Sequence, residues 1–199
     1  MPPNRTLRLP PTDLSARTLL RTRQPARPWF RVHQRAHHAI NFSLNPTHRF
    51  SHPSCACKIL YVAIDPQTCF WECFGDRLYD GGHSLPKTVW DDASLSTIDV
   101  PPLEVCDLAS AATRGALVVD LTALMNDDLA IPQAWGLAIQ NHPSQVPAIK
   151  FKSRFTGSAC LAIFERATVS AQLTESLVAP LNQCPAALDW LAKTKVALV

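Results

Sequence analysis

Residues 59–74 read ILYVAIDPQTCFWECF, and within this stretch the hydrophobic pattern changes from that of a strand to that of a helix. Ile59–Ala63 is a short apolar run rich in branched and aromatic residues, which is typical of a buried strand. The Asp65-Pro66 turn ends it. Beyond the turn, apolar residues recur at helical spacing, at Phe70, Cys73 and Phe74. The stretch therefore predicts a strand that is followed directly by one or two turns of helix.

Further strand and helix patterns lie on both sides of this stretch. We expect strands over residues 29–33, 99–108, 115–120, 148–155 and 160–164. The third of these is nearly all apolar, so we expect it at the centre of a sheet. We expect helical segments over residues 13–20, 121–125, 133–141 and 186–193, and a long loop over residues 41–57. Because strands and helices do not alternate regularly, the sequence predicts an α+β fold, a single domain with a twisted mixed sheet and flanking short helices.

Charge divides the chain into two unlike parts. Residues 1–60 contain ten Lys or Arg and one acidic residue, a balance of +9, whereas residues 61–199 contain nine Lys or Arg and fifteen acidic residues, a balance of −6. We expect a basic, proline-rich arm over residues 1–28 and a folded domain over residues 29–199, ending in a helical tail over residues 179–199. A basic front part suits an anionic ligand or a nucleic acid, or it docks against the acidic remainder.

Composition excludes several classes of protein. With 47% hydrophobic and 18% charged residues the chain can bury a core, which excludes wholesale disorder. No apolar run reaches the 18 residues of a membrane span, so we expect no membrane insertion. Residues 1–24 lack the apolar stretch of a secretory signal, and prolines at positions 2, 3, 10 and 11 would interrupt the helix of a transit peptide. Seven cysteines, an odd number, then indicate reduced thiols in a cytoplasmic protein.

One cysteine cluster is a candidate for structural zinc. It comprises Cys55-x-Cys57 and Cys69-x3-Cys73, with His48 and His52 nearby in the sequence. Structural zinc sites commonly use a CxxC pair on a tight turn, but Cys69 and Cys73 have the i, i+4 spacing of a helix and no glycine-containing turn flanks either pair. We therefore predict free, mostly buried thiols and no metal, with zinc as the alternative.

Four polar residues stand where a purely structural sheet has no need of them. Arg49 lies in the loop before the strand predicted over residues 59–63, Tyr61 lies within that strand, and Ser153 lies at the middle of a late strand. Glu72 lies in an otherwise apolar helix, where a buried carboxylate needs a partner, so it faces either solvent or a polar cleft. Each has an ordinary structural explanation when taken alone. No P-loop, nucleophile elbow or GxGxxG motif competes with them.

Taken together, the residues resemble the RES domain, a family named for its Arg, Glu and Ser. The matching segments cover residues 29–166: WFRV at 29–32, NF at 41–42, RF at 49–50, LYVA at 60–63, Glu72 eleven residues after Tyr61, DLT at 120–122, QAW at 133–135, IKFKSR at 149–154 and CLAIF at 160–164. Two departures stand out. The family has Gly before its motif Arg and Trp-Asn after it, where this chain has His48 and Phe50-Ser51, and the family's Asp-Gly before the Ser strand is replaced by Pro147-Ala148.

The resemblance implies a function and a set of roles. RES proteins are similar in fold to ADP-ribosyltransferases, degrade NAD as the toxins of bacterial toxin–antitoxin systems, and are neutralised by antitoxins with an Xre-like DNA-binding domain. Carried over by position, Arg49, Glu72 and Ser153 are the residues of the family name, Tyr61 is the associated aromatic residue, and Arg31 matches an upstream arginine. NAD is the substrate, and neither a cofactor nor a metal is implied.

Elementary chemistry agrees with these roles. Cleavage of the nicotinamide–ribose bond passes through an oxocarbenium-like state, which a fixed carboxylate such as Glu72 stabilises. We expect Ser153 to bond the ribose or orient this carboxylate, and Tyr61 to stack on the nicotinamide or the reacting ribose. Arg49 and Arg31 carry the planar guanidinium that matches the pyrophosphate of NAD. We therefore expect Tyr61, Glu72 and Ser153 to meet at one cleft.

Two other functions and several details stay open on sequence alone. The basic front part, with its interleaved aromatic residues, suits a nucleic-acid-binding module, although no DNA-reading helix or RNA-binding signature accompanies it, so direct contact with nucleic acid is not expected. The altered surroundings of Arg49 suit a catalytically inactive RES domain that serves as an interaction protein. Water, phosphate and a protein side chain are all possible acceptors. A homo-oligomer and a hetero-oligomer with an antitoxin both remain possible.

Overall fold

The computed structural model describes residues 9–199, and in that range eight strands form one curved sheet in the order β1-β6-β7-β8-β3-β2-β5-β9. The strands are β1 (Thr22–Gln24), β2 (Arg27–Gln34), β3 (Ile59–Ala63), β5 (Ala93–Val100), β6 (Leu103–Asp107), β7 (Ala148–Lys152), β8 (Ala159–Phe164) and β9 (Thr174–Pro180). The pair β6–β7 is parallel and the other neighbours are antiparallel. A separate parallel pair joins β4 (Ser84–Leu85) to β10 (Ala197–Leu198). The mixed sheet confirms the predicted α+β fold.

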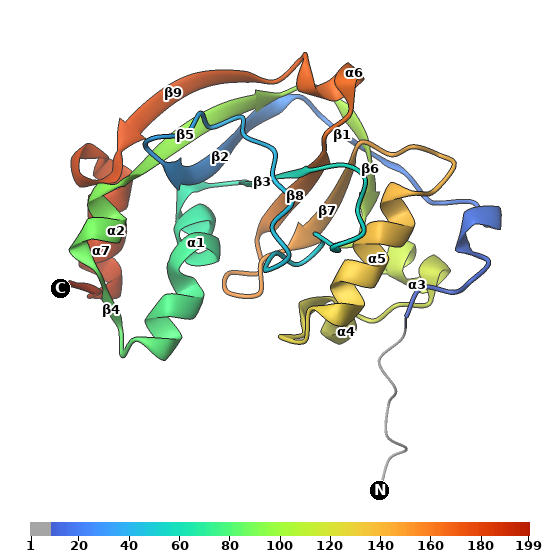
Figure 1. The fold of residues 1–199 in the computed structure, drawn as a ribbon, viewed down its shortest axis with the longest axis horizontal. Coiled ribbons are helices and arrows are strands. Elements are labelled where there is room, and N and C mark those ends of the chain that lie inside the picture. The colour runs from blue at the N-terminus through green and yellow to red at the C-terminus, as the bar shows by residue number, and fades with distance from the viewer. Residues whose placement is uncertain (1–8) are drawn as a thin grey trace, which may run out of the picture.

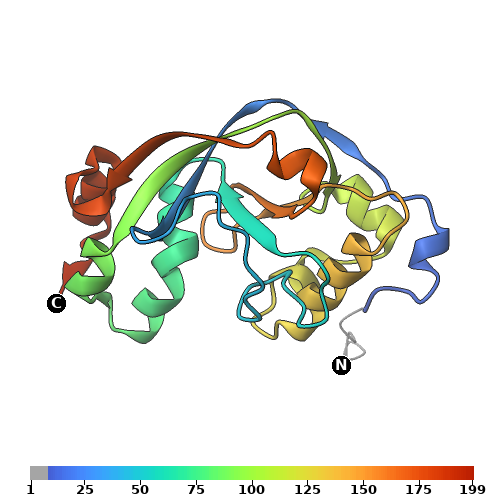
Figure 2. The same ribbon diagram turned by 45° about the horizontal axis from the view of Figure 1, so that its top comes forward.

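The sheet arches over two groups of helices, which lie on either side of β3, β8 and β7 in the view of Figure 1. One group comprises α1 (Pro66–Asp80), α2 (Lys87–Asp91) and α7 (Pro185–Thr194), and the other comprises α3 (Ala111–Leu117), α4 (Leu121–Met125) and α5 (Ala130–Gln140). The short α6 (Ala167–Ser170) lies beside β9 in the view of Figure 2. Two 3-10 turns, Leu14–Ala16 and Leu181–Gln183, complete the described elements. None of the helices in residues 9–199 is both long and apolar enough to cross a membrane.

Helix α1 begins where the sequence places it but is longer than predicted. Asp65 caps it, because its carboxylate accepts a 2.7 Å hydrogen bond from the Thr68 amide, and Pro66 occupies the first turn. The helix runs to Asp80 rather than for one or two turns. Beyond Phe74 the sequence is more polar, so the apolar period fades although the helix continues. In this second half Leu78 still reaches the core, whereas its polar neighbours are exposed.

Residues 115–120, predicted as a central strand, are not a strand. Gly115 lies within α3, and Val118 ends this helix with a left-handed backbone, at φ 57°. Asp120 then caps α4 by accepting a 2.7 Å hydrogen bond from the Ala123 amide. Val118 is exposed whereas Leu117 and Val119 are buried, so the apolar run marks the end of one helix and the approach to the next. A short apolar run fits a helix end as well as a strand, which explains the wrong prediction.

Two other predicted elements differ in extent. The strand predicted over residues 99–108 spans parts of β5 and β6, which are separated by Pro101 and Pro102 because proline cannot donate to a sheet ladder. The helix predicted over residues 13–20 is reduced to the 3-10 turn Leu14–Ala16. The helices predicted over residues 121–125, 133–141 and 186–193 are confirmed with small changes at their ends.

The proline-rich segment before residue 28 belongs to the folded domain over its described part, residues 9–28. Leu14 and Leu19 are buried in the main core, and β1 pairs with β6 at one edge of the sheet. Its basic side chains are mostly exposed, which is why charge alone suggested a separate arm. Residues 1–8 of the predicted arm lie outside the described residues.

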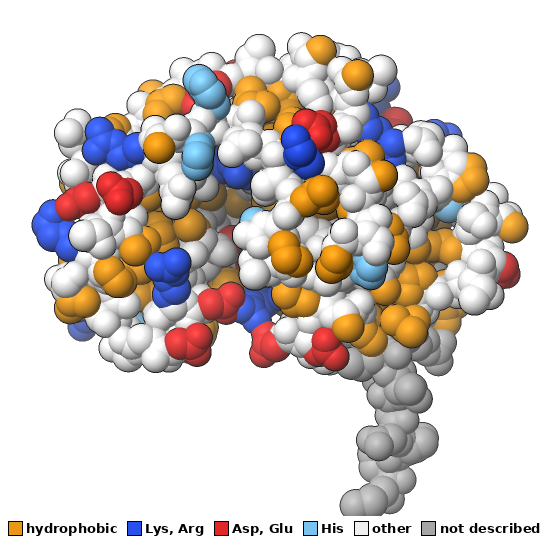
Figure 3. Space-filling view, in the orientation of Figure 1, with side chains coloured by type: hydrophobic (Ala, Val, Ile, Leu, Met, Phe, Trp, Pro, Cys, Tyr) orange, Lys and Arg blue, Asp and Glu red, His pale blue; other side chains and the backbone are white. Residues whose placement is uncertain are grey.

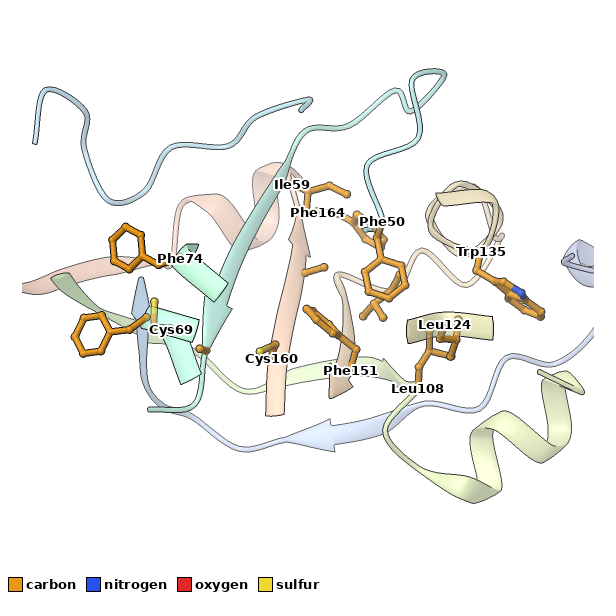
Figure 4. Packing of buried hydrophobic residues seen from close by; sticks show 14 of the residues in the cluster. Phe50, Ile59, Cys69, Phe74, Leu108, Leu124, Trp135, Phe151, Cys160 and Phe164 are labelled. Atoms are coloured by element: carbon orange, nitrogen blue, oxygen red, sulfur yellow. The ribbon is translucent and has the colours of Figure 1, made fainter. Parts of the chain in front are cut away.

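Alternate residues of the central strands face two hydrophobic cores. On the helix side, Ile59 and Ala63 of β3 join the core that includes α1, α5 and α7, and Tyr61 packs against the same core. Leu60 and Val62 point to a second core on the opposite face of the sheet. Figure 4 shows the helix-side core extending from Phe74 of α1 to Trp135 of α5, with Phe50 and Phe151 between them. The side chain of Tyr61 therefore lies on the helix side, beneath the arch.

Candidate active site

Glu72 and Ser153 meet across the space between α1 and the sheet. The Ser153 hydroxyl donates a 2.6 Å hydrogen bond to Oε1 of Glu72, joining residues 81 positions apart in the sequence. Ser153 is fully buried, whereas Glu72 keeps access to solvent. The predicted meeting of the Glu72 helix and the Ser153 segment at one place is confirmed. A carboxylate held by a buried hydroxyl and open on its other side can receive a polar ligand.

Ser153 does not lie at the middle of a strand, as predicted, but directly after β7. Its Oγ accepts 3.2 Å hydrogen bonds from the amides of Phe155 and Thr156, so it starts the turn between β7 and β8. Gly157 ends this turn with φ 72°. The alternating sequence continued past the strand end, which hid the turn. Because the turn amides donate to Ser153, its own proton is directed to Glu72.

Tyr61 joins β3 to the loop that carries Arg49. The Phe50 amide donates a 3.1 Å hydrogen bond to the Tyr61 hydroxyl, which also lies 3.1 Å from Oγ of Ser51. The imidazole of His48 packs edge-on against the Tyr61 ring, with centroids 5.1 Å apart. Burial raises the pKa of Tyr61 to about 12, so the phenol stays protonated at neutral pH. Tyr61 therefore fixes the loop that carries Arg49.

Arg49 lies on the opposite wall from Glu72 and is held by main-chain oxygens. Its Nη1 donates to the carbonyl of Leu124 at 2.7 Å and to that of Asn126 at 3.1 Å, at the end of α4. Burial lowers the pKa of Arg49, with Arg154 contributing in the same direction and Glu72 opposing it. A narrow recess beside Arg49 is lined by apolar residues that include Phe50, Leu124 and Phe151.

The loop before Arg49 is fixed from α5. The side-chain amide of Gln133 donates to the carbonyl oxygens of Pro46, at 2.5 Å, and of His48, at 3.2 Å. Gly136 lies one turn further along, where an added Cβ would come within 2.3 Å of the Phe50 carbonyl oxygen. The loop backbone therefore touches the helix backbone, which only glycine allows. This close contact sets the direction of Arg49.

Arg31 lies beside these residues rather than among them. In residues 9–199 a single pairing, Phe30 with Ala63, joins β2 to β3, and the two strands then separate. Nη1 of Arg31 donates to the Tyr61 carbonyl at 3.1 Å, and the Val32 amide donates to Sγ of Cys69 at 2.9 Å. These side chains satisfy backbone groups that the missing ladder leaves open. The guanidinium of Arg31 thus supports the strand that carries Tyr61.

The electrostatic surroundings of Glu72 determine its protonation. Desolvation by burial raises the pKa of Glu72 above its ordinary value of about 4.3, while the Ser153 hydrogen bond and the positive charges of Arg49 and Arg154 oppose the rise. Arg49 and Glu72 thus share one electrostatic environment. The site combines a carboxylate whose pKa is raised by burial with two cations that favour its charged form.

Arg154 was assigned no role from the sequence, and His48 was considered only as a neighbour of the possible zinc cluster. Arg154 follows Ser153 directly, and its guanidinium forms ion pairs with Asp76 of α1 and with Asp127, which lies between α4 and α5. Burial lowers the pKa of His48, with Arg31 contributing in the same direction, so its ring is neutral beside Tyr61. Arg154 directly follows the motif residue Ser153, and this position in the sequence could have indicated that it lies at the site. No sequence signal pointed to a role for His48 at this site, because it stands where the family pattern has a different residue.

All seven cysteines are free thiols. Within residues 9–199 no three His, Cys, Asp or Glu side chains are grouped closely enough to hold a metal ion. Cys69 instead accepts the Val32 hydrogen bond, and burial raises the pKa of its thiol. Its role in the described structure is therefore to close the gap between β2 and β3.

Figure 3 shows the surface hollowed between the α1 side and the α4–α5 side, with acidic side chains gathered along the lower rim. Glu72 and Asp76 belong to the first side, and Arg49, bonded to α4, belongs to the second. The structure thus brings Arg49, Tyr61, Glu72 and Ser153 to one region beneath the arch of the sheet. The arrangement offers cations, a carboxylate and aromatic rings to a single ligand.

Comparisons with known proteins give the chain its family. A chain of the crystal structure of the M. tuberculosis MbcT–MbcA toxin–antitoxin complex is similar in fold, with a TM-score of 0.68 and 20% sequence identity, over 88% of this chain and 92% of that chain. No curated protein sequence matches closely enough to show a relationship. The family model of the RES domain matches residues 28–182, which include all the residues described at this site. The chain therefore belongs to the RES domain family.

Proposed function

We propose that this protein is a toxin that consumes NAD by cleaving its nicotinamide–ribose bond. The observation that carries the proposal is the 2.6 Å hydrogen bond from Ser153 to Glu72, in a site that Arg49 also influences. Membership of the RES family supports the same reaction. NAD is the substrate, and the reaction proposed here needs no cofactor or metal.

Each residue has a role that follows from its surroundings. As the nicotinamide leaves, positive charge develops on the ribose, and the Glu72 carboxylate stabilises it. Ser153 holds Oε1, so the carboxylate is oriented before substrate arrives. The ring of Tyr61 packs against the nicotinamide or its ribose. Arg49 contacts the pyrophosphate, and Arg31 supports the Tyr61 strand through its carbonyl bond. Water, phosphate or a protein side chain then attacks the same carbon, giving hydrolysis, phosphorolysis or ADP-ribosyl transfer.

The partner that we propose is an antitoxin of the Xre type. The structural likeness to a chain of a toxin–antitoxin complex supports a protein partner. In this proposal a hetero-oligomer with the antitoxin covers the hollow between the α1 side and the α4–α5 side. The proposed place of action is the cytoplasm, where NAD is available.

A second candidate is a catalytically inactive RES domain that acts through protein contacts. The observation that favours it is the engagement of Arg49, whose Nη1 is already bonded to two carbonyl oxygens. In this candidate Arg49 is a structural residue and binds no phosphate.

Turnover of NAD separates the two candidates. Purified protein is incubated with NAD, with and without inorganic phosphate, and free nicotinamide is measured. Glu72→Gln keeps the shape and the Ser153 bond but removes the charge, so we expect kcat to fall by roughly 100-fold or more with little change in KM. Expression of the parent should deplete cellular NAD and arrest growth, and expression of Glu72→Gln should not. Equal turnover by the parent and Glu72→Gln would contradict the proposed role of the carboxylate.

A further inference from the structure

Helix α1 carries a second group of side chains on the same face as Glu72. Tyr79 lies seven residues further along, which is close to two helical turns and about 10 Å along the axis. Asp76 lies between them, one turn beyond Glu72. The three residues therefore follow one another from the deep end of α1 towards its exposed end. A ligand bound at Glu72 that extends along α1 would meet the surroundings of Asp76 and then of Tyr79.

Arg154 stands beside the middle of this row. Its guanidinium forms ion pairs with Asp76 on one side of the hollow and Asp127 on the other. The side chain of Arg154 is 24% exposed, whereas those of Asp76 and Asp127 are 69% and 86% exposed. The cation is fixed by the turn that carries Ser153, and its two acidic partners are surface groups that can turn away into water. Arg154 is thus a half-buried cation next to the proposed reaction centre.

An aromatic row lies next to Arg154. The Phe155 ring packs over Gly75, where an added Cβ would come within 2.5 Å of it. On either side the Phe155 ring is nearly parallel to the rings of Trp71 and Tyr79, with centroid distances of 6.1 and 6.0 Å. The guanidinium of Arg154 lies 4.8 Å from the Phe155 centroid. Tyr79 is 77% exposed, so one of the largest side chains on α1 presents its ring to solvent instead of to the core.

We propose that Arg154, Phe155 and Tyr79 form the subsite for the adenylate half of NAD, with Arg154 joining Arg49 at the pyrophosphate and the Tyr79 ring against the adenine. This inference rests on the proposed function and names the substrate as a dinucleotide. The order along α1 matches the order of groups in NAD, since Glu72 serves the nicotinamide ribose, Arg154 the phosphates and Tyr79 the distal base. Aromatic rings bind bases by stacking, and guanidinium groups bind phosphates through paired hydrogen bonds.

The two aspartates give the proposal a sharp consequence. Exposed ion pairs contribute little free energy, so phosphate can replace the carboxylates around Arg154. The same carboxylates repel a phosphate, and they compete with it for the guanidinium. Removing Arg154 should therefore weaken NAD binding, whereas removing the charge of Asp127 should strengthen it. A purely structural ion-pair bridge predicts the same sign for both changes, because either change breaks the bridge.

The first experiment compares NAD with nicotinamide mononucleotide, which has the reacting bond but lacks the adenylate. Tyr79→Ala should raise KM for NAD about tenfold, equivalent to about 1.4 kcal/mol, and leave KM for the mononucleotide unchanged. Tyr79→Phe retains the ring and should behave as the parent does. An equal rise in KM for both substrates would overturn the proposal, because it would show that Tyr79 affects the whole site.

The second experiment tests whether substitutions of Arg154 and Asp127 change KM for NAD in opposite directions. Measured at a pH where Glu72 is ionised, Arg154→Gln should raise KM for NAD about tenfold or more, and Asp127→Asn should lower it about threefold. Arg77→Gln removes an exposed guanidinium from α1 and controls for the change in net charge. If Arg154→Gln and Asp127→Asn both raise KM, the bridge is structural and the phosphate contact is wrong.

Binding of ADP separates failure of this inference from failure of the proposed function. ADP carries the adenine, its ribose and the pyrophosphate, and calorimetry measures its binding without any turnover. The parent should bind ADP, and Tyr79→Ala and Arg154→Gln should each weaken the binding about tenfold. A parent that binds ADP but cleaves no NAD refutes the reaction and leaves the subsite standing. A parent that cleaves NAD but does not bind ADP refutes the subsite.

Discussion

At the scale of single residues, the site depends on how a few polar groups share charge and hydrogen bonds. Glu72 is the centre of this set, because Ser153 donates to it and the charges of Arg49 and Arg154 act on it. Because burial raises its pKa, Glu72 stays protonated to a higher pH than an ordinary glutamate does. Activity and stability should both report this protonation.

Ser153→Ala should move the acid limb of the pH–rate profile to higher pH. The proposed reaction needs the charged carboxylate, so the rate falls as the pH drops through the pKa of Glu72. The Ser153 hydrogen bond favours the charged form, and its loss should raise this pKa further. The measurement is kcat/KM for NAD between pH 4 and 9, with Ser158→Ala in the same turn as the control. An acid limb that stays in place would show that Ser153 does not tune Glu72.

Glu72→Gln should raise the melting temperature at pH 7 although it removes activity. Because the folded state has the higher pKa, the charged carboxylate disfavours folding at every pH above that value. The gain should shrink as the pH falls, and should disappear below the ordinary pKa of glutamate, where the group is neutral in both states. Melting curves of both proteins from pH 4 to 8 test whether Glu72→Gln melts at the higher temperature. A lower melting temperature for Glu72→Gln at pH 7 would contradict the desolvation argument.

At the scale of elements, the site is assembled by contacts that hold two irregular segments, the turn after β7 and the loop before Arg49, against helices. The turn after β7 presents Ser153, and its Thr156 hydroxyl lies 3.1 Å from that of Thr68 in the first turn of α1. The loop before Arg49 is held in the same way by Gln133 and Gly136 of α5. These contacts fix loop geometry from rigid helices, which is how a site on loops keeps its shape.

Gly136→Ala should displace the Arg49 loop. The new Cβ would lie 2.3 Å from the Phe50 carbonyl oxygen, which is backbone and cannot turn away. We expect a loss of about 1–3 kcal/mol in the free energy of unfolding and a rise in KM for NAD. Gly115→Ala, at a helical position with open space around its Cβ, is the matched control and should be neutral or slightly stabilising. Unchanged stability and KM for Gly136→Ala would mean that the loop accommodates the methyl group.

Strands and helices with an unambiguous hydrophobic pattern were predictable from the sequence. Elements whose structure is set by tertiary contacts were not. The strand Ile59–Ala63 was predicted because its apolar residues are branched or aromatic and the Asp65-Pro66 turn ends the run, and the helix that follows was predicted from the spacing of its apolar residues. Gly115 lies in a helix because burial of Leu117 and Val119 overrides a run that also fits a strand. Glu72 and Ser153 were found through the family resemblance, and their meeting at one place was predicted, with orientation of the carboxylate as one of two roles for Ser153. The carbonyl bonds of Arg49 and Arg31 were not, because no sequence pattern shows which backbone oxygens a loop will expose.

At the scale of the whole molecule, the sheet joins the two groups of helices that form the walls of the hollow. The central strands β3 and β8 carry both hydrophobic cores, one on each face. The edge strand β1 belongs to the same sheet and connects the basic N-terminal segment to β6. That segment should therefore contribute to stability as well as to charge.

Leu19→Ala should test whether the N-terminal segment is integral to the domain. Leu19 is 4% exposed and lies in the main core, whereas its neighbour Leu20 is 42% exposed. We expect Leu19→Ala to lower the free energy of unfolding by about 2–5 kcal/mol and Leu20→Ala to change it by less than about 1 kcal/mol. Urea denaturation of the three proteins provides the comparison. Equal stability of Leu19→Ala and the parent would mean that residues before β1 contribute nothing to the core.

The order of strands in the sheet has a consequence for synthesis on the ribosome. β3 lies between β8 and β2, and β8 is made about a hundred residues after β3. While the chain is growing, Arg49, Tyr61 and Glu72 emerge early, but Ser153 reaches Glu72 only when β7 and β8 have closed the sheet beside β3. A nascent chain that ends before Phe164 lacks part of β8, and so it lacks the sheet that holds Ser153 against Glu72. A ribosome that stalls or terminates early should therefore release fragments without the completed site, and the proposed activity should appear only once nearly the whole domain exists.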